Sequence, residues 1–468
     1  VILVNTKLPK SCHKLYIIEI MSTANTTFLI LASVLVLFMT PGLAFFYGGL
    51  GSKKNVVNTM MSVFVMCGLA VVLWVICGYS LSFVGDFGGV FGSLSALLLH
   101  GAKLTALTST KIPTSLYLIF QMMFAVITPA LFVGAVVGRI RFKFLLLFTV
   151  FWSIFIYYPL VHMVWANGFL AKMGVIDFAG GTVVHIDAGV TALVLAYFLG
   201  PRIGYRKGKQ EGHYSLPWAL LGTTILWIGW YGFNAGSALA ANQIAVQAVL
   251  TTTVATACSM ITWMLIEMSL KGKATLAGIC NGTLCGLVGI TPATGYVTVA
   301  GSFWIGILAA VASYFFVNFL KARIGIDDAL DAFGCHGVCG IVGSILTGLF
   351  ASRAVNSSIS INGLFYGGGF KLFAVQLFAT LFSVIFTALI CFVIIKFLKL
   401  FMKMRVDVKE EQKGLDFGEH GENVDYVISL TLEAYQFEDQ KKEFFQDEPN
   451  NLKEVSKNSK DTLNSTIS

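Results

Sequence analysis

The chain of 468 residues is 56% hydrophobic and only 12% charged, and its mean hydropathy is +0.78. A soluble domain carries about 25% charged residues, so this composition excludes a soluble enzyme, a nucleic-acid-binding protein and a disordered chain. The net charge of +8 is unevenly placed: residues 1–402 hold 23 Lys and Arg against 9 Asp and Glu, whereas residues 403–468 hold 9 against 15. These numbers predict an all-α polytopic membrane protein with an acidic tail.

Apolar stretches recur along the chain at lengths that suit a lipid bilayer, whose core of about 30 Å needs about 20 apolar residues per helix. The sequence predicts eleven transmembrane helices. The loops on one side hold 13 Lys and Arg and those on the other side hold 5, which predicts an N-terminus outside and a C-terminus inside. The predicted spans are 28–50, 56–84, 114–138, 144–165, 180–200, 216–240, 244–269, 274–293, 297–320, 333–351 and 372–402.

The two ends of the chain differ in composition from the middle. Residues 1–23 are predicted to be an N-terminal extension outside the true start, because Met21 leads directly into the first span. A signal peptide is the alternative, but residues 15–20 are too short and too polar for its apolar region. The transmembrane domain is predicted at 24–402. Residues 427–468, rich in Asp, Glu, Lys, Asn and Ser, are predicted to form a disordered acidic tail.

Two similar motifs lie five predicted helices apart. Asp177 precedes His185 by eight residues, and Asp328 precedes His336 by the same number, each pair at the start of the last helix of a five-helix half. Because each half has an odd number of helices, the sequence predicts two inverted five-helix repeats plus one helix. Such repeats place the substrate path near the membrane midplane. We therefore expect His185 and His336 to meet deep in a pore, and solute transport is the leading hypothesis.

Few ionisable side chains fall within the predicted spans. Intramembrane charges are costly and are functional candidates by default, although a lone histidine is more often a hydrogen-bonded core residue. The matched positions of His185 and His336 favour function, whereas His162 has no counterpart and is predicted to be structural. Glu267 lies near a helix end and is expected to reach the membrane surface. Asp177 begins a helix, where an N-capping role and a direct substrate contact are both open.

Aromatic side chains lie at the candidate mouths of the pore, namely Phe120, Phe124, Trp165 and Phe233. Each alone is more often packing than ligand, but Trp165 near the outer end of a span suits a cation–π platform. The motif Cys335-His336-x-x-Cys339 lacks a further ligand pair to complete a metal site. With no HExxH, Ser/Lys dyad or cofactor motif, the sequence predicts neither an enzyme nor a bound metal or cofactor.

Seven long motifs follow one another along roughly residues 24–425. They are Pro41-Gly-Leu-Ala-Phe-Phe-Tyr-Gly-Gly49, Phe120-Gln-x-x-Phe124-Ala, His162-Met-Val-Trp165, Asp177-Phe-Ala-Gly-Gly-Thr-Val-Val-His185 through Gly200-Pro-Arg202, Gly229-Trp-Tyr-Gly-Phe-Asn-Ala-Gly-Ser237, Asn281-Gly-x-Leu-x-Gly-Leu-Val288 and Asp331-Ala-Phe-Gly-Cys-His-Gly-Val-Cys-Gly340. In kind and order they resemble the ammonium transporter family (Amt/Mep/Rh). The presence of both Trp165 and Ser237 resembles its bacterial-type Amt branch.

The resemblance implies an eleven-helix bundle with one pore per subunit, assembled as a homotrimer in the cell (inner or plasma) membrane. It also implies roles for individual residues: an outer ammonium site at Phe120, Trp165 and Ser237 with Phe124 as floor, a gate of Phe124 and Phe233, twin pore histidines His185 and His336, and supporting carboxylates Asp177 and Asp328. Asp177 is expected to order the outer site from behind.

The segments Glu411–Asp416 and His420–Asn423 resemble the family's cytoplasmic tail, so residues 403–426 are expected to dock under the bundle. In many bacterial members a PII-type regulator plugs the pore from that side. Asp187 departs from the pattern of the family, in which we expect Asn at this position. Asp187 either faces the pore and adds a charge or turns to neighbouring helices. Its position about 200° around the helix from His185 favours the second.

Ammonium and potassium are alike in charge and size, but only ammonium can release a proton. A ring face with a hydroxyl acceptor can hold the cation, an apolar lumen penalises any intact cation, and two histidines can accept hydrogen bonds from ammonia and relay a proton. The predicted function is ammonium transport that excludes potassium, with methylammonium as an analogue substrate. The net charge of the transported species stays open. A Rh-like gas channel and an ammonium sensor are the alternatives.

Overall fold

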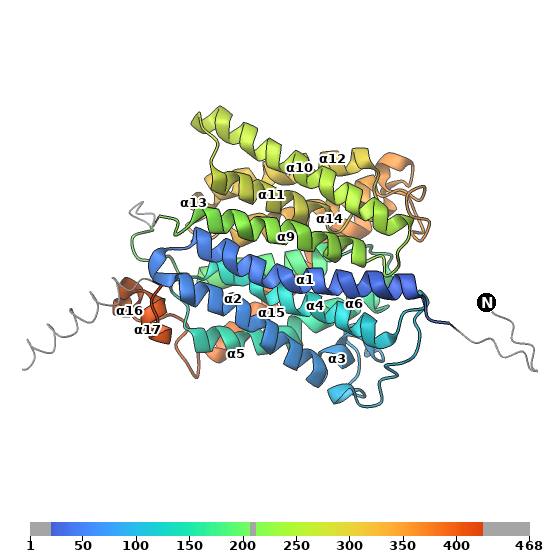
Figure 1. The fold of residues 1–468 in the computed structure, drawn as a ribbon, viewed down its shortest axis with the longest axis horizontal. Coiled ribbons are helices and arrows are strands. Elements are labelled where there is room, and N and C mark those ends of the chain that lie inside the picture. Colours follow the sequence, from blue (N-terminus) through green and yellow to red (C-terminus); the bar gives the residue numbers. More distant parts are fainter. Residues whose placement is uncertain (1–19, 206–211, 425–468) are drawn as a thin grey trace, which may run out of the picture.

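The computed structural model describes residues 20–205 and 212–424, which fold into one bundle of long α-helices (Figure 1). The helices run side by side along the longest axis of the molecule, and α1 (Thr23–Leu50) packs along α9 (Leu216–Gly236) in the middle of the bundle. Isolated bridges are the only β structure in these residues. The all-α fold class predicted from the sequence is confirmed.

The remaining helices follow in chain order. They are α2 (Val56–Leu73), α3 (Tyr79–Phe83), α4 (Thr114–Phe132), α5 (Phe142–Trp152), α6 (Tyr158–Trp165), α7 (Phe169–Lys172), α8 (Asp187–Leu199), α10 (Gln243–Lys271), α11 (Leu276–Ile290), α12 (Val299–Phe315), α13 (Lys321–Ile324), α14 (Cys339–Phe350), α15 (Phe370–Leu398), α16 (Val408–Lys413) and α17 (Leu415–His420). Short π-helical segments join several of them, for example Gly181–Ile186 before α8 and Phe333–Val338 before α14.

Nine helical segments in the described part of the chain are long and apolar enough to cross a membrane. They are Thr23–Leu50, Lys53–Phe83, Thr114–Val136, Phe142–Lys172, Gly181–Leu199, Gln243–Lys271, Val299–Ile324, Phe333–Phe350 and Phe370–Leu398. The other two predicted spans, 216–240 and 274–293, coincide with α9 and α11, which are helical but do not meet both the length and the hydropathy of the nine. The count of eleven crossings is therefore part of the proposal below.

Polar side chains fix where several helices begin. The hydroxyl oxygens of Ser215, Thr275 and Thr298 and the amide oxygen of Asn242 each accept a hydrogen bond from the backbone N–H three residues later, at 3.0–3.4 Å. These residues satisfy an N–H group that the first helical turn leaves without a partner. The predicted starts at 216, 244, 274 and 297 lie within two residues of the observed helix starts for this reason.

Small residues let α1 and α9, the first helices of the two predicted halves, approach closely. A Cβ atom added to Gly49 would lie 2.6 Å from the Ser215 carbonyl oxygen, and one added to Gly232 would lie 2.7 Å from the Ala32 carbonyl oxygen. Close backbone packing of this kind stabilises helix pairs in lipid, where apolar side chains gain little by burial. The two halves are thus joined along their first helices.

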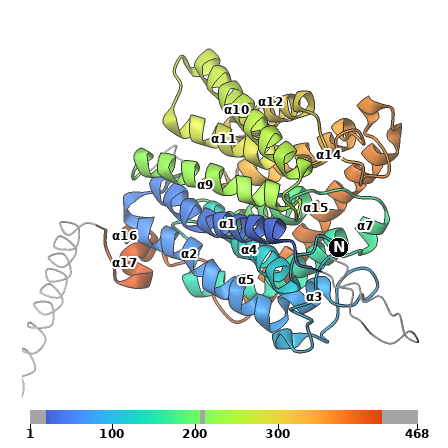
Figure 2. The same ribbon diagram turned by 45° about the vertical axis from the view of Figure 1, so that its right-hand side comes forward.

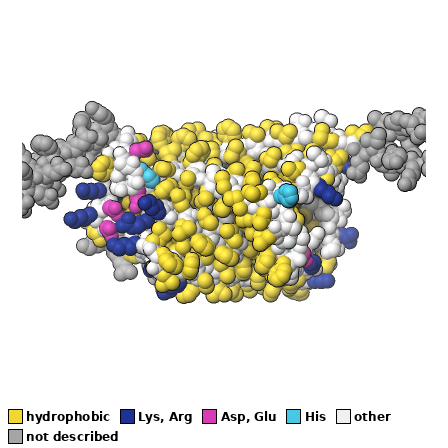
Figure 3. Space-filling view, turned by 90° about the horizontal axis from the view of Figure 1, so that it is seen from below, with side chains coloured by type: hydrophobic (Ala, Val, Ile, Leu, Met, Phe, Trp, Pro, Cys, Tyr) yellow, Lys and Arg dark blue, Asp and Glu magenta, His cyan; other side chains and the backbone are white. Residues whose placement is uncertain are grey.

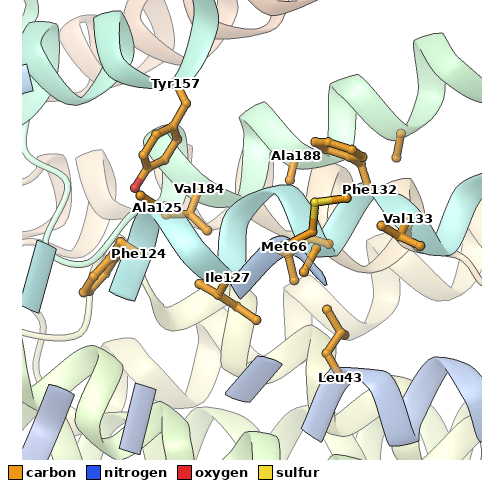
Figure 4. Packing of buried hydrophobic residues seen from close by; sticks show 14 of the residues in the cluster. Leu43, Met66, Phe124, Ala125, Ile127, Phe132, Val133, Tyr157, Val184 and Ala188 are labelled. Atoms are coloured by element: carbon orange, nitrogen blue, oxygen red, sulfur yellow. The ribbon is translucent and has the colours of Figure 1, made fainter. Parts of the chain in front are cut away.

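The surface and the interior both suit a lipid environment. On the face seen in Figure 3, apolar side chains cover the middle of the bundle, and charged side chains gather at its two ends. Inside, Phe124, Ile127 and Phe132 of α4 pack with Leu43 of α1 and Val184 (Figure 4). The end that carries α16 and α17 is called the tail end below, and the opposite end, near α7, is called the far end (Figure 2).

The segment after α15 contacts the tail end of the bundle. Asp416 accepts a hydrogen bond from the Asn58 backbone N–H at 2.8 Å, and Glu411 accepts one from the Ile203 N–H at 2.8 Å. Arg405 forms an ion pair with Glu411 at 2.7 Å. The predicted acidic tail 427–468, most of the predicted extension 1–23 and the basic residues of 206–211 lie outside the described residues.

Candidate functional site

The predicted outer residues converge at the far end of the bundle. The Phe124 ring centroid lies 5.1 Å from that of Phe120 and 5.7 Å from that of Trp165, both edge to face, so Phe124 contacts both of the other rings. The Ser237 hydroxyl donates a hydrogen bond to the Phe233 carbonyl oxygen at 2.9 Å. Its oxygen keeps its lone pairs free to accept a hydrogen bond from a cation such as ammonium.

Asp177 holds this region together from behind. Its backbone carbonyl accepts a hydrogen bond from Trp165 Nε1 at 2.9 Å, which fixes the indole ring. Its carboxylate accepts from the backbone N–H groups of Gly180, Gly181 and Thr182 at 2.9, 2.6 and 2.8 Å. Both carboxylate oxygens are thus engaged at the start of a π-helical segment, and the capping role is the one that this geometry supports.

Asp328 caps the corresponding π-helical segment in the second half of the chain. Its carboxylate accepts hydrogen bonds from the backbone N–H groups of Ala332 and Phe333 at 2.9 Å each and from Gly334 at 3.3 Å. Burial raises the pKa of Asp328 to about 6, although the Lys321 ammonium lowers it. The eight-residue Asp-to-His spacing noticed in the sequence therefore gives one local structure twice: a capped π-helical segment that carries a histidine.

Two stacked phenyl rings separate the outer residues from the histidines. The ring centroids of Phe124 and Phe233 lie 4.3 Å apart with an angle of 26° between the planes, and both side chains are at most 1% exposed. The Phe233 ring centroid lies 6.0 Å from that of His185. A hydrated cation that moves from the outer residues toward His185 must displace this pair, so the position suits a gate.

His185 and His336 lie face to face inside the bundle. Their ring centroids are 5.5 Å apart, the planes differ by 14°, and each side chain is 1% exposed. Both ring nitrogens of His185 and the Nδ1 atom of His336 lack a hydrogen-bond partner among the described residues. The prediction that the two histidines meet deep in the bundle agrees with this geometry. Buried polar atoms without partners are costly unless a ligand or water satisfies them.

A close backbone approach makes this meeting possible. A Cβ atom added to Gly189 would collide with the backbone of Gly337, so α8 and the segment Phe333–Val338 touch without an intervening side chain. A Cβ atom added to Gly340 would lie 3.1 Å from the Cβ of His185. Glycines at these two positions thus let each histidine-bearing segment reach the other.

Sequence reasoning missed Trp230. Its ring stacks on His185 with centroids 5.4 Å apart and 15° between the planes, and its Nε1 donates a hydrogen bond to Thr291 Oγ1 at 2.9 Å. Trp230 lies three residues before Phe233, which places both side chains on one face of α9. That spacing is the signal that could have identified it.

Two of the other ionisable residues within the predicted spans have structural partners. His162 is fully buried between the Ser82 carbonyl oxygen at 3.0 Å and Asp86 Oδ1 at 3.2 Å, as its structural interpretation predicts. Glu267 lies in the last turns of α10 with its side chain only 5% exposed. It accepts a hydrogen bond at 3.0 Å from the N–H of Thr275, the residue that caps α11, and lies 3.5 Å from the Lys271 ammonium.

Asp187 turns away from His185. Its Oδ1 lies 3.4 Å from the Thr387 hydroxyl of α15, so it faces the neighbouring helix, the second of the two alternatives left open by the sequence. Among the described residues, no group of three His, Cys, Asp or Glu side chains is arranged to hold a metal ion, and Cys335 and Cys339 are free thiols.

An ionic network closes the tail end. Arg202 forms two hydrogen bonds of 2.8 Å with the carboxylate of Asp327, and the fully buried Arg139 donates to the backbone oxygens of Gly200 and Asp327. Burial raises the pKa of Asp327, but Arg202 and Arg139 outweigh it and hold the pKa below its ordinary value. Burial lowers the pKa of Arg139 to about 10, so this guanidinium stays charged at neutral pH.

Known proteins share both the sequence and the fold. The profile of the Ammonium Transporter Family matches residues 27–425. The chain is 44% identical to an ammonium transporter of Aquifex aeolicus over 404 residues, which is 86% of this chain and 93% of that protein. It is 42% identical to an ammonium transporter of Bacillus subtilis over 403 residues, 86% of this chain and 98% of that protein.

Solved structures agree. The crystal structure of Saccharomyces cerevisiae Mep2 superimposes with a TM-score of 0.78 and 32% identity, covering 83% of this chain and 89% of that one. A protein described as a sensor Amt protein gives a TM-score of 0.78 and 26% identity, covering 85% and 98%. Since the family profile and relatives above 40% identity both cover most of its length, the chain belongs to the ammonium transporter family.

Proposed function

We propose that the protein recruits ammonium at the outer site of Phe120, Trp165 and Ser237, removes a proton near the Phe124–Phe233 gate and conducts ammonia past the twin histidines. The observation that carries the proposal is the placement of His185 behind the stacked phenyl rings. It is 1% exposed, lies 5.5 Å from His336 between ring centroids, and has no partner at either nitrogen among the described residues.

The order of these groups explains how potassium is excluded. The faces of aromatic rings attract any monovalent cation by about 0.5–2 kcal/mol, so the outer site alone does not select strongly. Beyond the gate, an intact cation loses its hydration without a compensating charge, a cost that neutral ammonia largely avoids. Ammonium can give up its proton to the pair of His185 and His336, which relays it along the pore beside ammonia so that net charge crosses, and potassium has no proton to give. The neutral ring of His185 can accept a hydrogen bond from ammonia at one nitrogen and donate one from the other.

The proposal also covers the membrane topology and the assembly of the protein. The protein crosses the cell (inner or plasma) membrane with eleven helices, its N-terminus outside and its tail end in the cytoplasm, which the distribution of Lys and Arg between the loops supports. The proposal includes a homotrimer with one pore per subunit and a tail end that can receive a PII-type regulator, and membership in the family supports both. The contacts of Glu411 and Asp416 support docking of the segment 403–426 in the same place.

The decisive experiment records currents from purified protein in liposomes on a solid-supported membrane. We expect currents after ammonium and methylammonium pulses and none after potassium pulses. A variant with His100→Ala, an exposed histidine of a far-end loop, should behave like the wild type, whereas His185→Ala should lose current. No response to ammonium would contradict transport, and uptake of ammonia without current would favour a Rh-like gas channel.

A further inference from the structure

The seam between α8 and α15 contains a buried carboxyl group that the proposed function does not use. Asp187, the first residue of α8, is fully buried and lies in the membrane-spanning segment Gly181–Leu199. Its Oδ1 lies 3.4 Å from the Thr387 hydroxyl of α15, and its Oδ2 has no hydrogen-bond partner among the described residues. The same residues provide no Lys or Arg that forms an ion pair with Asp187.

Contacts between residues 200 positions apart align the two sides of the seam in parallel. Gln376 of α15 accepts a hydrogen bond from the Ile176 N–H at 3.0 Å and donates one to the Ile176 carbonyl oxygen at 2.8 Å. The pair of Asp187 and Thr387 follows in the same register. Because residues four apart share one face of a helix, Ser383 lies one turn before Thr387 on the face of α15 that meets α8.

Two hydroxyl groups of α15 in this seam lack a partner. Thr380 and Ser383 are at most 1% exposed, and their hydroxyl oxygens have no hydrogen-bond partner among the described residues. Many buried hydroxyls elsewhere in the bundle, such as those of Thr149 and Thr347, donate to the carbonyl oxygen four residues earlier in their own helix. Those of Thr380 and Ser383 do not, so they are free to bond across the seam.

The surroundings of the carboxyl group carry no positive charge. Its titratable neighbours are the Tyr157 phenol and the Cys391 thiol, both of which are uncharged acids at neutral pH. The helix α4, which also packs on α8, has no charged residue. His185 and His336 face each other on the opposite side of α8. An ionised carboxylate in the seam would lose its hydration without a counter-charge, a cost that a protonated carboxyl group avoids.

We propose that Asp187 is a proton-binding site of the protein. Its carboxyl group carries a proton at neutral pH and donates it in a hydrogen bond to the Ser383 hydroxyl, directly or through one buried water. The proton removes a negative charge that would lie about one helix diameter, ~10 Å, from the histidine pair. At that distance in apolar surroundings, a carboxylate would lower the cost of an intact cation in the pore. This effect on selectivity rests on the proposed function, whereas the proton site does not.

Infrared spectroscopy of the full chain in liposomes detects the proton directly. At pH 7 the wild type should show the C=O stretching band of a protonated carboxylic acid that Asp187→Asn lacks, and the band should shift in D2O. The control is Asp86→Asn, because the Lys172 ammonium lowers the pKa of Asp86 to about 2 and this variant should lose carboxylate bands only. Loss of carboxylate bands in Asp187→Asn would overturn the proposal.

The acceptor of the proton is tested in the same spectrum. Ser383→Ala should move the carboxylic acid band to higher frequency, because the hydrogen bond that weakens the C=O bond is lost. Thr380→Ala, which removes the other unpartnered hydroxyl of α15, is the matched control and should leave the band in place. A band that is unchanged in Ser383→Ala, or that shifts equally in both variants, would overturn the assignment of Ser383.

Stability measures the same proton by linkage. A carboxyl group that keeps its proton in the folded chain releases it on unfolding above the unfolded pKa of about 3.9, so stability falls as the pH rises. Relative to Asp187→Asn, the ratio of unfolded to folded wild type should rise about tenfold per pH unit between about pH 5 and 8. The melting temperature in detergent follows this change. A difference that does not depend on pH would mean that Asp187 is ionised.

Potassium pulses on liposomes test the effect on selectivity. The wild type should exclude potassium for as long as the infrared band persists and should pass it in alkaline solution once the band has disappeared. Asp187→Asn, which cannot ionise, should exclude potassium throughout. Exclusion by the wild type after the band has disappeared would overturn the effect on selectivity. The ammonium current of the same liposomes tests the proposed function separately.

Discussion

His162 and His185 are both buried histidines, and their hydrogen bonds distinguish them. His162 has a partner at each nitrogen, Ser82 and Asp86, whereas His185 has none among the described residues. A buried polar group without a partner costs about 1–3 kcal/mol, which a purely structural histidine has no reason to bear. The unpartnered nitrogens of His185 therefore point to a ligand, and this difference directs the first prediction.

Replacing His185 by Asp should open the pore to potassium. The carboxylate adds a fixed negative charge to an apolar region, which offsets the desolvation cost for any monovalent cation, including one that has no proton to lose. We expect ammonium flux to persist or rise and potassium to pass. Growth of a potassium-uptake-deficient host on low potassium measures the effect directly.

The variant His185→Ala distinguishes the effect of an added negative charge from the effect of removing the imidazole ring. It takes away the proton relay without supplying a charge, so flux should fall and potassium should stay excluded. If the His185→Asp variant conducts ammonium but still excludes potassium, selectivity does not reside at the histidines. It would then have to lie at the outer site around Trp165 and Ser237.

Trp165→Leu should weaken the outer site. The indole ring, held by its hydrogen bond to the Asp177 carbonyl, provides a cation–π contact of about 0.5–2 kcal/mol, so half-maximal current should need roughly 2- to 30-fold more ammonium. Trp304→Leu is a suitable control, because Trp304 is 51% exposed on α12 and away from these rings. An unchanged concentration dependence in Trp165→Leu would remove Trp165 from the site.

At the scale of elements, Asp327 ties the loop before α14 to the loop after α8 through Arg202. The carboxylate is buried, and Arg202 is 30% exposed. Asp327→Asn weakens both hydrogen bonds to Arg202 and removes the negative charge next to the fully buried Arg139, so it should reduce the free energy of unfolding by about 3 kcal/mol. The melting temperature in detergent measures this. Asp407→Asn breaks an exposed ion pair with Arg141 and should change the melting temperature little.

The effect of Asp327 should also depend on pH. The pKa of Asp327 in the folded protein lies below the ordinary value. Its contribution to the free energy of unfolding is therefore fully present above the unfolded pKa of about 3.9, and it is lost as the pH falls through the folded pKa. The difference in melting temperature between wild type and Asp327→Asn should be constant from about pH 6 to 8 and shrink below about pH 4. A difference that grows in acid would contradict the assigned direction.

Hydrophobicity and turn chemistry allowed the long helices to be predicted from the sequence, but not their irregularities. The caps at Ser215, Asn242 and Thr298 are local signals, so the helix starts agree closely. The π-helical segments are not visible in a 3.6-residue pattern, because they depend on how neighbouring helices pack. The hydrogen bond from the Thr275 N–H to Glu267 was not predicted for a similar reason: Thr275 lies beyond the end of α10 and caps the next helix.

The candidate site, too, was predicted from the sequence only in part. The equal spacing of Asp177 to His185 and of Asp328 to His336 predicted that the two histidines would meet, because we interpreted it as an internal repeat. The stacking of Trp230 on His185 was not predicted, because it needs the relative rotation of α8 and α9.

At the scale of the whole molecule, the segment after α15 joins parts of the bundle that are distant in sequence. Arg405 donates hydrogen bonds to the carbonyl oxygens of Leu199 and Pro201, and Glu411 accepts one from the Ile203 N–H. Asp416 reaches the start of α2. Burial raises the pKa of Asp416, although its backbone hydrogen bonds lower it. The tail thus links the start of α2 to the end of α8 at the proposed cytoplasmic mouth.

Two truncations test whether these links matter for transport. A chain that ends at residue 426 keeps Arg405, Glu411 and Asp416, and we expect nearly wild-type currents per inserted protein. A chain that ends at Met404 loses all three, so the loops around α2 and α8 lose their shared partner and currents should fall. Solid-supported membrane recordings, normalised to the protein found in the liposomes, compare the two. Equal currents from both chains would mean that α16 and α17 cover the tail end without acting on the pore.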